Sequence, residues 1–255
     1  MSGTNRILIA TVCLERNRWG NRQPSFAVSE WLPRFVAEGF DGIELWAPHY
    51  RAAAGAEQAR LEQAAPLAIY NSYVGFDDAD AAARADEAAA ITRLRAAAVK
   101  YNVGNDREFL PVYQANVLEW AEQLPSDCRL LCECHPGTAL EQPEVAAPFM
   151  RALPPERFGA IVHVRGGEAE ALARWFELLG ERVQHLHVQF RGDDSDPSCA
   201  DHRAALDPNL AVLREHRFAG TLTVEFTRGI GPDEDIEVVY ANACADLRYL
   251  SAGLA

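Results

Sequence analysis

The 255-residue chain is poor in basic residues. It holds 24 Lys and Arg against 37 Asp and Glu, which gives a formal net charge of −13. Proteins that bind nucleic acid cluster their cations on one face to neutralise phosphates, and this sequence has no basic stripe. We therefore expect no nucleic-acid partner. The acidic residues are spread along the chain, which indicates a solvated surface.

Long apolar runs and paired cysteine motifs are also missing. No segment reaches membrane-spanning length without a charge, and the N-terminal MSGTNRILIATVCL lacks a signal-peptide cleavage pattern. We therefore expect a cytoplasmic protein with no membrane partner. None of the cysteines has CxxC spacing, which argues against a zinc ribbon or a thioredoxin motif. Reduced and mostly buried thiols are the simplest expectation for Cys13, Cys128, Cys132, Cys134, Cys199 and Cys244.

About half of the chain is hydrophobic, and the apolar residues recur in short runs. Nearly continuous apolar runs of this length are typical of strands buried on both faces of a parallel sheet. They predict strands at residues 7–12, 42–45, 67–72, 99–103, 129–134, 159–164, 183–188 and 222–226. Helical patterns, often bounded by proline or glycine, fill the intervals at residues 26–38, 52–64, 79–97, 109–124, 143–153, 168–179, 207–217 and 233–252.

Eight strand–helix pairs in a chain of this length match one (β/α)8 TIM barrel, an α/β fold. No linker or shift in composition divides the sequence, so we expect a single domain over residues 1–255. A doubly wound open sheet is the alternative, but neither GxGxxG nor GxxxxGK[ST] follows the first predicted strand.

Polar side chains stand at the carboxyl ends of several predicted strands, where barrel enzymes place their active sites. Glu133 and His135 are two residues apart and share a strand face, as do His163 and Arg165. If these faces point inward, carboxylates and imidazoles from neighbouring strands converge. Buried charges are costly unless they are paired or bind a cation. A mixed Glu and His set suits a divalent ion such as Mn²⁺, Zn²⁺, Co²⁺ or Mg²⁺.

Four motifs, GFDGIELW, LLCECHPGT, VQHLHVQF and GTLTVEF, resemble those of the xylose-isomerase-like TIM barrels. This family includes sugar isomerases and epimerases, hydroxypyruvate isomerase, inosose dehydratase and 3-dehydroshikimate dehydratase. The resemblance covers nearly the whole chain. EGFDGIELWAPH and ECHPGT are most similar to the last of these enzymes.

The resemblance implies a set of site residues. It assigns a divalent metal ion to Glu133, His163, His187 and Glu225, with His163 where the family usually has an aspartate. It makes Glu133 and Glu225 the catalytic pair, and it leaves His135 as an acid or substrate contact. His185 is expected to support His187. Further substrate contacts are expected, by their position at strand ends, from Glu44, His49, Tyr70, Lys100, Arg165 and Gln189.

Three functions are compatible with these residues. The first is isomerisation or epimerisation of a small ketose-like substrate, in which a proton is removed and returned through an enediolate. The second is a metal-dependent lyase of the dehydroshikimate or inosose dehydratase type; Gln189 and Lys100 stand where the dehydroshikimate enzymes have lysine and arginine. The third is a non-catalytic barrel subunit with an altered metal site. A small-molecule substrate is the expected partner, and the chain is a candidate homo-oligomer.

Overall fold

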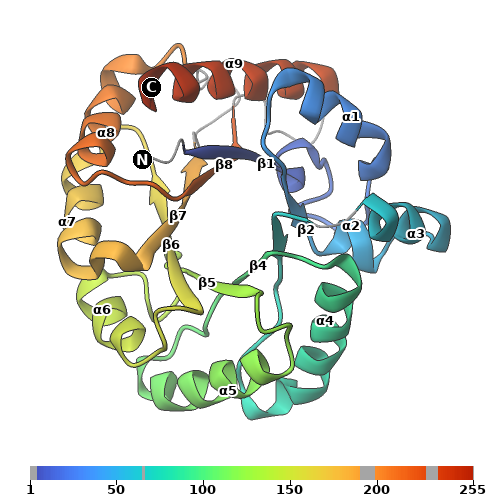
Figure 1. Ribbon diagram of the computed structural model, residues 1–255, viewed down its shortest axis with the longest axis vertical. Coiled ribbons are helices and arrows are strands. Elements are labelled where there is room, and N and C mark those ends of the chain that lie inside the picture. The colour runs from blue at the N-terminus through green and yellow to red at the C-terminus, as the bar shows by residue number, and fades with distance from the viewer. Residues whose placement is uncertain (1–4, 65–66, 190–198, 228–234, 255) are drawn as a thin grey trace.

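The computed structural model describes residues 5–64, 67–189, 199–227 and 235–254. Eight parallel strands pair in chain order, and β8 pairs with β1 to close a barrel (Figure 1). The predicted (β/α)8 fold is therefore confirmed. The strands are β1 (Arg6–Ala10), β2 (Ile43–Trp46), β3 (Ile69–Asn71), β4 (Ala98–Tyr101), β5 (Arg129–Glu133), β6 (Phe158–Val164), β7 (Val183–Gln189) and β8 (Thr221–Phe226).

A ring of helices surrounds the barrel (Figure 1). Their bounds follow the helical patterns of the sequence, with two differences. Pro48 begins a short extra helix, and the helix predicted at 207–217 begins earlier, at Arg203. The helices are α1 (Val28–Glu38), α2 (Pro48–Arg51), α3 (Gly55–Ala64), α4 (Ala81–Leu94), α5 (Leu110–Glu122), α6 (Pro143–Arg151), α7 (Ala169–Leu179), α8 (Arg203–Glu215) and α9 (Ile236–Leu254).

Strand alternation divides the core into an outer and an inner part. Side chains that point outward join the helices in the main core, whereas inward side chains form a separate small cluster. That inner cluster consists of Leu8, Ile69, Ala98, Leu131 and Ile161, all buried. These apolar residues lie near the beginnings of the strands. Further along, several inward positions become polar, and a third apolar cluster of Ala10, Val12, Trp46 and Phe226 lies beside them.

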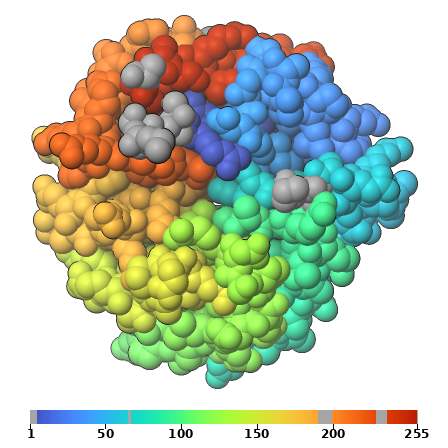
Figure 2. All heavy atoms as spheres, in the orientation of Figure 1, coloured from blue at the N-terminus to red at the C-terminus, as the bar shows by residue number. Residues whose placement is uncertain are grey.

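The first and last helices of the ring meet where the barrel closes. Helices α1 and α9 lie side by side, and the space-filling view shows their atoms in contact at the surface (Figures 1 and 2). Trp31 of α1 packs edge-on against Tyr240 of α9, with ring centroids 5.3 Å apart. Arg34 also pairs with Glu237, but both side chains are solvent-exposed. An exposed pair contributes at most about 1 kcal/mol, so the aromatic contact and the β1–β8 ladder carry the closure.

All six cysteines are free and buried, as the sequence predicts. Burial raises the pKa of the Cys132 thiol to about 12. Such thiols are poor nucleophiles and metal ligands near neutral pH. Among the helices in the described ranges, none is long and apolar enough to cross a membrane.

Candidate metal centre

Four side chains from consecutive strands meet inside the barrel near its carboxyl end. Glu133 ends β5, and His163, His187 and Glu225 lie on β6, β7 and β8. Glu133 Oε1 lies 3.0 Å from both His163 Nε2 and His187 Nδ1, and His187 Nδ1 lies 3.2 Å from Glu225 Oε2. All four ligand atoms lie within 4.8 Å of one another. We call these four residues the metal cluster.

The cluster has the chemistry of a divalent-cation site. It offers two carboxylate oxygens and two imidazole nitrogens, a donor set that suits Zn²⁺, Mn²⁺ or Co²⁺. Four ligands at bonding distance around a tetrahedral ion lie roughly 3.4 Å apart. Four of the six separations between these atoms run from 3.0 to 4.0 Å, close to that spacing, and all six are within 4.8 Å. Three of the four residues are buried and the fourth is nearly so, which limits competition from solvent.

Without an ion, His187 is held among carboxylates. Burial alone would lower the pKa of His187, but the charges of Glu225 and Glu44 outweigh it and raise that pKa well above 6.5. Likewise, burial would raise the pKa of Glu133, but Lys100 and the histidines lower it well below 4.5. Without an ion, the negative charges of Glu133 and Glu225 are therefore partly balanced by Lys100 and by protonated His187.

A hydrogen-bond network from Glu44 fixes the ring of His187. Glu44 is fully buried, and its Oε2 lies 3.0 Å from His187 Nε2 and accepts from Thr223 Oγ1, also at 3.0 Å. Its Oε1 accepts from Asn71 Nδ2 at 2.6 Å. When Nε2 donates to Glu44, Nδ1 is left to face the metal cluster. Glu44 is therefore placed against the His187 ring, and its contact with substrate stays a prediction.

His185 belongs to the same network, as expected for a residue that supports His187. Its Nε2 lies 2.9 Å from Thr223 Oγ1 and 3.4 Å from Glu44 Oε2. His185, His187 and Glu44 form a second group with metal-ligand spacing. All three are fully buried inside the barrel. Because His187 is also part of the metal cluster, we assign His185 and Glu44 to holding its ring in place.

Lys100 lies directly beside the metal cluster. Its Nζ is 2.8 Å from Glu133 Oε2, and Asn102 Nδ2 donates to the same oxygen at 2.9 Å. One oxygen of Glu133 thus faces the cluster while the other is held by Lys100 and Asn102. The half-exposed ring of Tyr73 lies 4.4 Å from Lys100 Nζ. Asn102 and Tyr73 were not among the predicted site residues, although Asn102 lies two positions after Lys100.

Three further predicted residues lie next to the cluster. Gln189 Nε2 donates to Glu225 Oε2, and Arg165 donates from Nη2 to Gln189 Oε1 at 3.2 Å. The half-buried His135 lies next to His163, with ring centroids 5.5 Å apart. The structure therefore brings Lys100, Gln189, Arg165 and His135 to the site.

Two predicted residues lie elsewhere. Tyr70 is fully buried in the main core, because it is the middle residue of β3 and points toward the helices. His49 lies in α2, with Nε2 2.8 Å from Glu15 Oε2 and Nδ1 2.8 Å from Thr11 Oγ1. His49, Glu15 and Thr11 are all buried. The structure therefore does not bring Tyr70 or His49 to the metal cluster, and their contact with substrate stays a prediction.

The Glu15–His49 contact predicts a measurable effect of pH on stability. Burial would raise the pKa of Glu15, but hydrogen bonds from His49, Ser25 and Asn17 outweigh it and lower the pKa to about 2 from 4.5. The stabilisation is then complete above pH 4.5 and is lost as the pH falls toward 2. By linkage it amounts to roughly 3 kcal/mol.

Urea unfolding of the native protein and of Glu15→Gln between pH 5 and 2.5 measures this effect. We expect the stability of the native protein to fall more steeply on acidification than that of the variant. Parallel curves for the two proteins would contradict the assignment. Glu30→Gln, which alters an exposed glutamate of α1, is the control and should follow the native protein.

Comparison with known proteins gives structural matches only. No protein-family model and no curated protein sequence matches the chain. Among solved structures, the probable 3-DHS dehydratase AsbF of Bacillus anthracis matches at 13% identity, over 97% of this chain and 98% of that chain, with a TM-score of 0.71. The IolI protein with a bound zinc atom matches at 14% identity, over 98% and 99%, with a TM-score of 0.69. A D-tagatose 3-epimerase-like protein matches at 13% identity, over 98% and 97%, with a TM-score of 0.67.

These matches show which fold the chain adopts. It has the fold of the xylose isomerase-like TIM barrels, as the sequence motifs predict. The matched structures belong to proteins described by different activities, and at this level of identity the fold does not determine the reaction. The reaction has to be argued from the site.

Proposed function

We propose that this protein is a divalent-metal-dependent isomerase or epimerase of a small ketose-like polyhydroxy carbonyl compound. The observation that carries the proposal is the pair Glu133 and Glu225, which approach the same buried cluster from β5 and β8 with different partners. An enzyme that moves a proton between two positions needs two such groups, or one group that reaches both. The epimerase-like fold match and the zinc atom in the IolI structure support the proposal.

The different surroundings of the two glutamates assign their roles. Lys100 and Asn102 hold one oxygen of Glu133, which makes this carboxylate a weak base. Glu225 accepts from Gln189 at Oε2, and within the described ranges its Oε1 has no hydrogen-bond partner. Glu225 is therefore the group that removes the proton from substrate. Glu133 is ionised, so the proton that returns to substrate starts on the Lys100 ammonium and passes through Glu133. Groups whose environments differ in this way commonly divide the acid and base roles.

An ion bound at the metal cluster would supply the Lewis acidity that makes a C–H beside a carbonyl acidic enough to lose its proton. The side chains around it would orient the substrate. Arg165 and Gln189 offer hydrogen bonds to hydroxyl groups, and Tyr73 covers the Lys100 side. Lys100 itself is engaged by Glu133. This arrangement suits an uncharged polyhydroxy substrate better than a phosphorylated one.

A lyase is the second candidate, and His135 is the observation that favours it. Its Nδ1 donates to the Pro136 carbonyl at 2.5 Å, so Nε2 accepts in the neutral ring and donates a proton in the imidazolium form. A proton donor there would assist the departure of a β-hydroxyl once the first proton is removed. The probable 3-DHS dehydratase has the same fold.

Proton exchange with solvent distinguishes the candidates. The protein, loaded with Mn²⁺, Zn²⁺ or Co²⁺, is incubated in D₂O with fructose, tagatose, psicose and 3-dehydroshikimate. An isomerase or epimerase incorporates deuterium beside the ketose carbonyl and forms the isomer, both visible by NMR. A lyase instead converts 3-dehydroshikimate to an unsaturated product that absorbs in the ultraviolet.

The metal-free, chelated protein is the control and should show neither reaction. If the metal-loaded protein binds its ion but gives neither exchange nor elimination with a broad panel of ketoses and inososes, the proposal is wrong. The third interpretation, a barrel without catalytic activity, would then replace it.

A further inference from the structure

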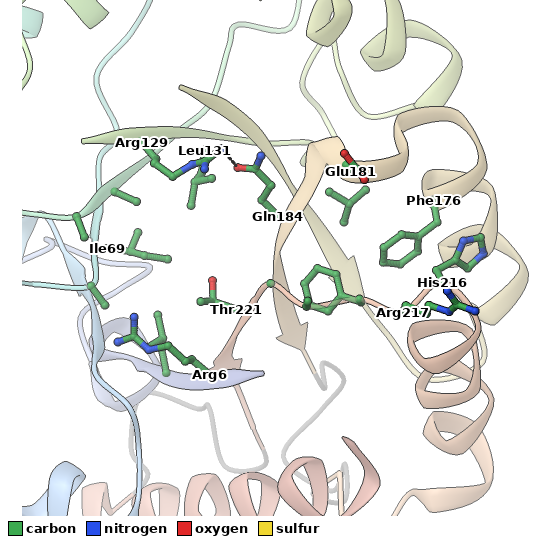
Figure 3. A pocket seen from close by; sticks show the side chains of 18 of the residues that line it. Arg6, Ile69, Arg129, Leu131, Phe176, Glu181, Gln184, His216, Arg217 and Thr221 are labelled. Atoms are coloured by element: carbon green, nitrogen blue, oxygen red, sulfur yellow. Dashed lines mark hydrogen bonds between the residues drawn. The ribbon is translucent and has the colours of Figure 1, made fainter. Parts of the chain in front are cut away.

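A cavity of about 810 Å³ lies at the opposite end of the barrel from the metal cluster, where the strands begin (Figure 3). Its apolar floor includes Leu8, Ile69 and Leu131, which belong to the inner cluster and separate it from the polar interior above. Ligand-binding cavities of proteins commonly measure about 300–1,000 Å³ and are mostly apolar with a few polar groups. The size and the floor are therefore those of a small-molecule site.

Three guanidinium groups line this cavity. Arg6 comes from the start of β1, Arg129 from the start of β5, and Arg217 from the segment between α8 and β8. Glu181 is the one acidic residue among the lining residues. The excess of cations is notable in a chain with 37 acidic and 24 basic side chains. A local positive field of this kind favours an anion whatever the net charge of the protein.

The hydrogen bonds of these arginines position them without neutralising them. Arg6 Nη2 donates to the Asp41 carbonyl at 3.0 Å, and Arg129 Nη2 donates to Gln184 Oε1 at 2.6 Å (Figure 3). Both acceptors are uncharged. Arg129 Nε is buried without a hydrogen-bond partner, and in the described part of the chain neither guanidinium pairs with a carboxylate. Arg6 is solvent-exposed and Arg129 is partly buried, so their free N–H groups face the cavity and its solvent, where a bound oxyanion would accept charge-assisted hydrogen bonds.

An aromatic wall continues the cavity toward α7. The rings of Phe176 and Phe218 meet edge to face with centroids 5.8 Å apart, and His216 stacks on Phe176 at 5.0 Å. We propose that the cavity binds a small organic oxyanion with a flat apolar body. Its acidic group lies with Arg6 and Arg129, and its body packs on the apolar floor and the aromatic wall. The site does not depend on the proposed enzymatic function.

Two fluorescent probes test the proposal. 8-Anilinonaphthalene-1-sulfonate carries an anionic group on an aromatic body, and N-phenyl-1-naphthylamine has the same rings without the charge. We expect the sulfonate to bind at one site at least tenfold more tightly than the amine. The double variant Arg6→Gln/Arg129→Gln should weaken sulfonate binding at least tenfold and change amine binding less than twofold.

The matched control is Arg34→Gln/Arg174→Gln, which removes the same charge from exposed ion pairs on the outer helices. It should bind both probes like the native protein, and so should His163→Ala, which alters only the metal cluster. Should the glutamine double variant fail to fold, Arg6→Lys/Arg129→Lys keeps both charges and should retain sulfonate binding. Sulfonate binding that is unchanged in the glutamine variant, or lost in His163→Ala, would overturn the proposal.

Competition identifies the acidic group. Benzoate and phenyl phosphate share one ring and differ in their anion, so each is titrated against the bound sulfonate. Displacement by benzoate assigns a carboxylate ligand, and displacement by phenyl phosphate assigns a phosphate ester. If neither compound displaces the sulfonate from the native protein, the cavity is not an oxyanion site.

Discussion

Replacing Glu225 by glutamine is expected to lower turnover about 10³-fold or more on any substrate identified by the exchange assay. The carboxamide keeps the shape of the side chain but can neither remove a proton nor carry the negative charge. Glu133→Gln should cause a similar loss. It also breaks the contact with Lys100 and leaves that buried cation without its partner carboxylate. Steady-state kinetics with each variant measures the effect.

Metal content has to be measured on the same samples, because both glutamates belong to the metal cluster. The comparison is made at an ion concentration that saturates each variant, so that loss of chemistry is separated from loss of metal. Glu237→Gln, which alters an exposed glutamate of α9, is the control and should retain full turnover. Full turnover in both Glu133→Gln and Glu225→Gln would show that the two-glutamate mechanism is wrong.

Glu44→Gln is expected to weaken metal binding 10- to 100-fold, although Glu44 is not itself in the metal cluster. Its carboxylate holds His187 Nε2 and also accepts from Asn71 and Thr223. A carboxamide satisfies fewer of these donors, so the ring of His187 loses its fixed orientation and part of its basicity. Competition with a calibrated chelator gives the affinity of each protein.

Glu57→Gln is a suitable control, since Glu57 is also a buried carboxylate but accepts from Ser29 between α1 and α3. It should bind metal like the native protein. Unchanged metal affinity in Glu44→Gln would mean that Glu44 serves only the fold. In that case thermal unfolding, but not metal binding, would distinguish the variant from the native protein.

The barrel was predictable from the sequence because its strands are buried on both faces and its helices are bounded by recognisable residues. Gly39, for example, ends α1 in a left-handed conformation with φ of 104°, which glycine adopts without strain. Alternation along strands also predicted that carboxylates and imidazoles from neighbouring strands would converge if their faces point inward. The set of Glu133, His163, His187 and Glu225 came from the family resemblance, which assigns one ligand to each of four strand ends.

Sequence reasoning is weakest for residues whose position depends on neighbours far away in the chain. Tyr70 and Asn71 are adjacent at the end of β3, and only the start of the strand decides which of them points inward. His49 follows β2 closely, but α2 carries it to Glu15 and Thr11. Glu44 does point inward, yet its depth below His187 is a property of the assembled barrel.

Elemental analysis is the most direct test of the metal cluster. The protein is first stripped with chelator and then reloaded with Mn²⁺, Zn²⁺ or Co²⁺. We expect about one equivalent of bound ion in the native protein and almost none in His163→Ala. His163→Asp, which supplies a carboxylate at the same position, should restore binding, and His216→Ala, remote from the cluster, should not affect it. Absence of metal in the native protein after reloading with excess ion would contradict the account and leave the barrel without its proposed chemistry.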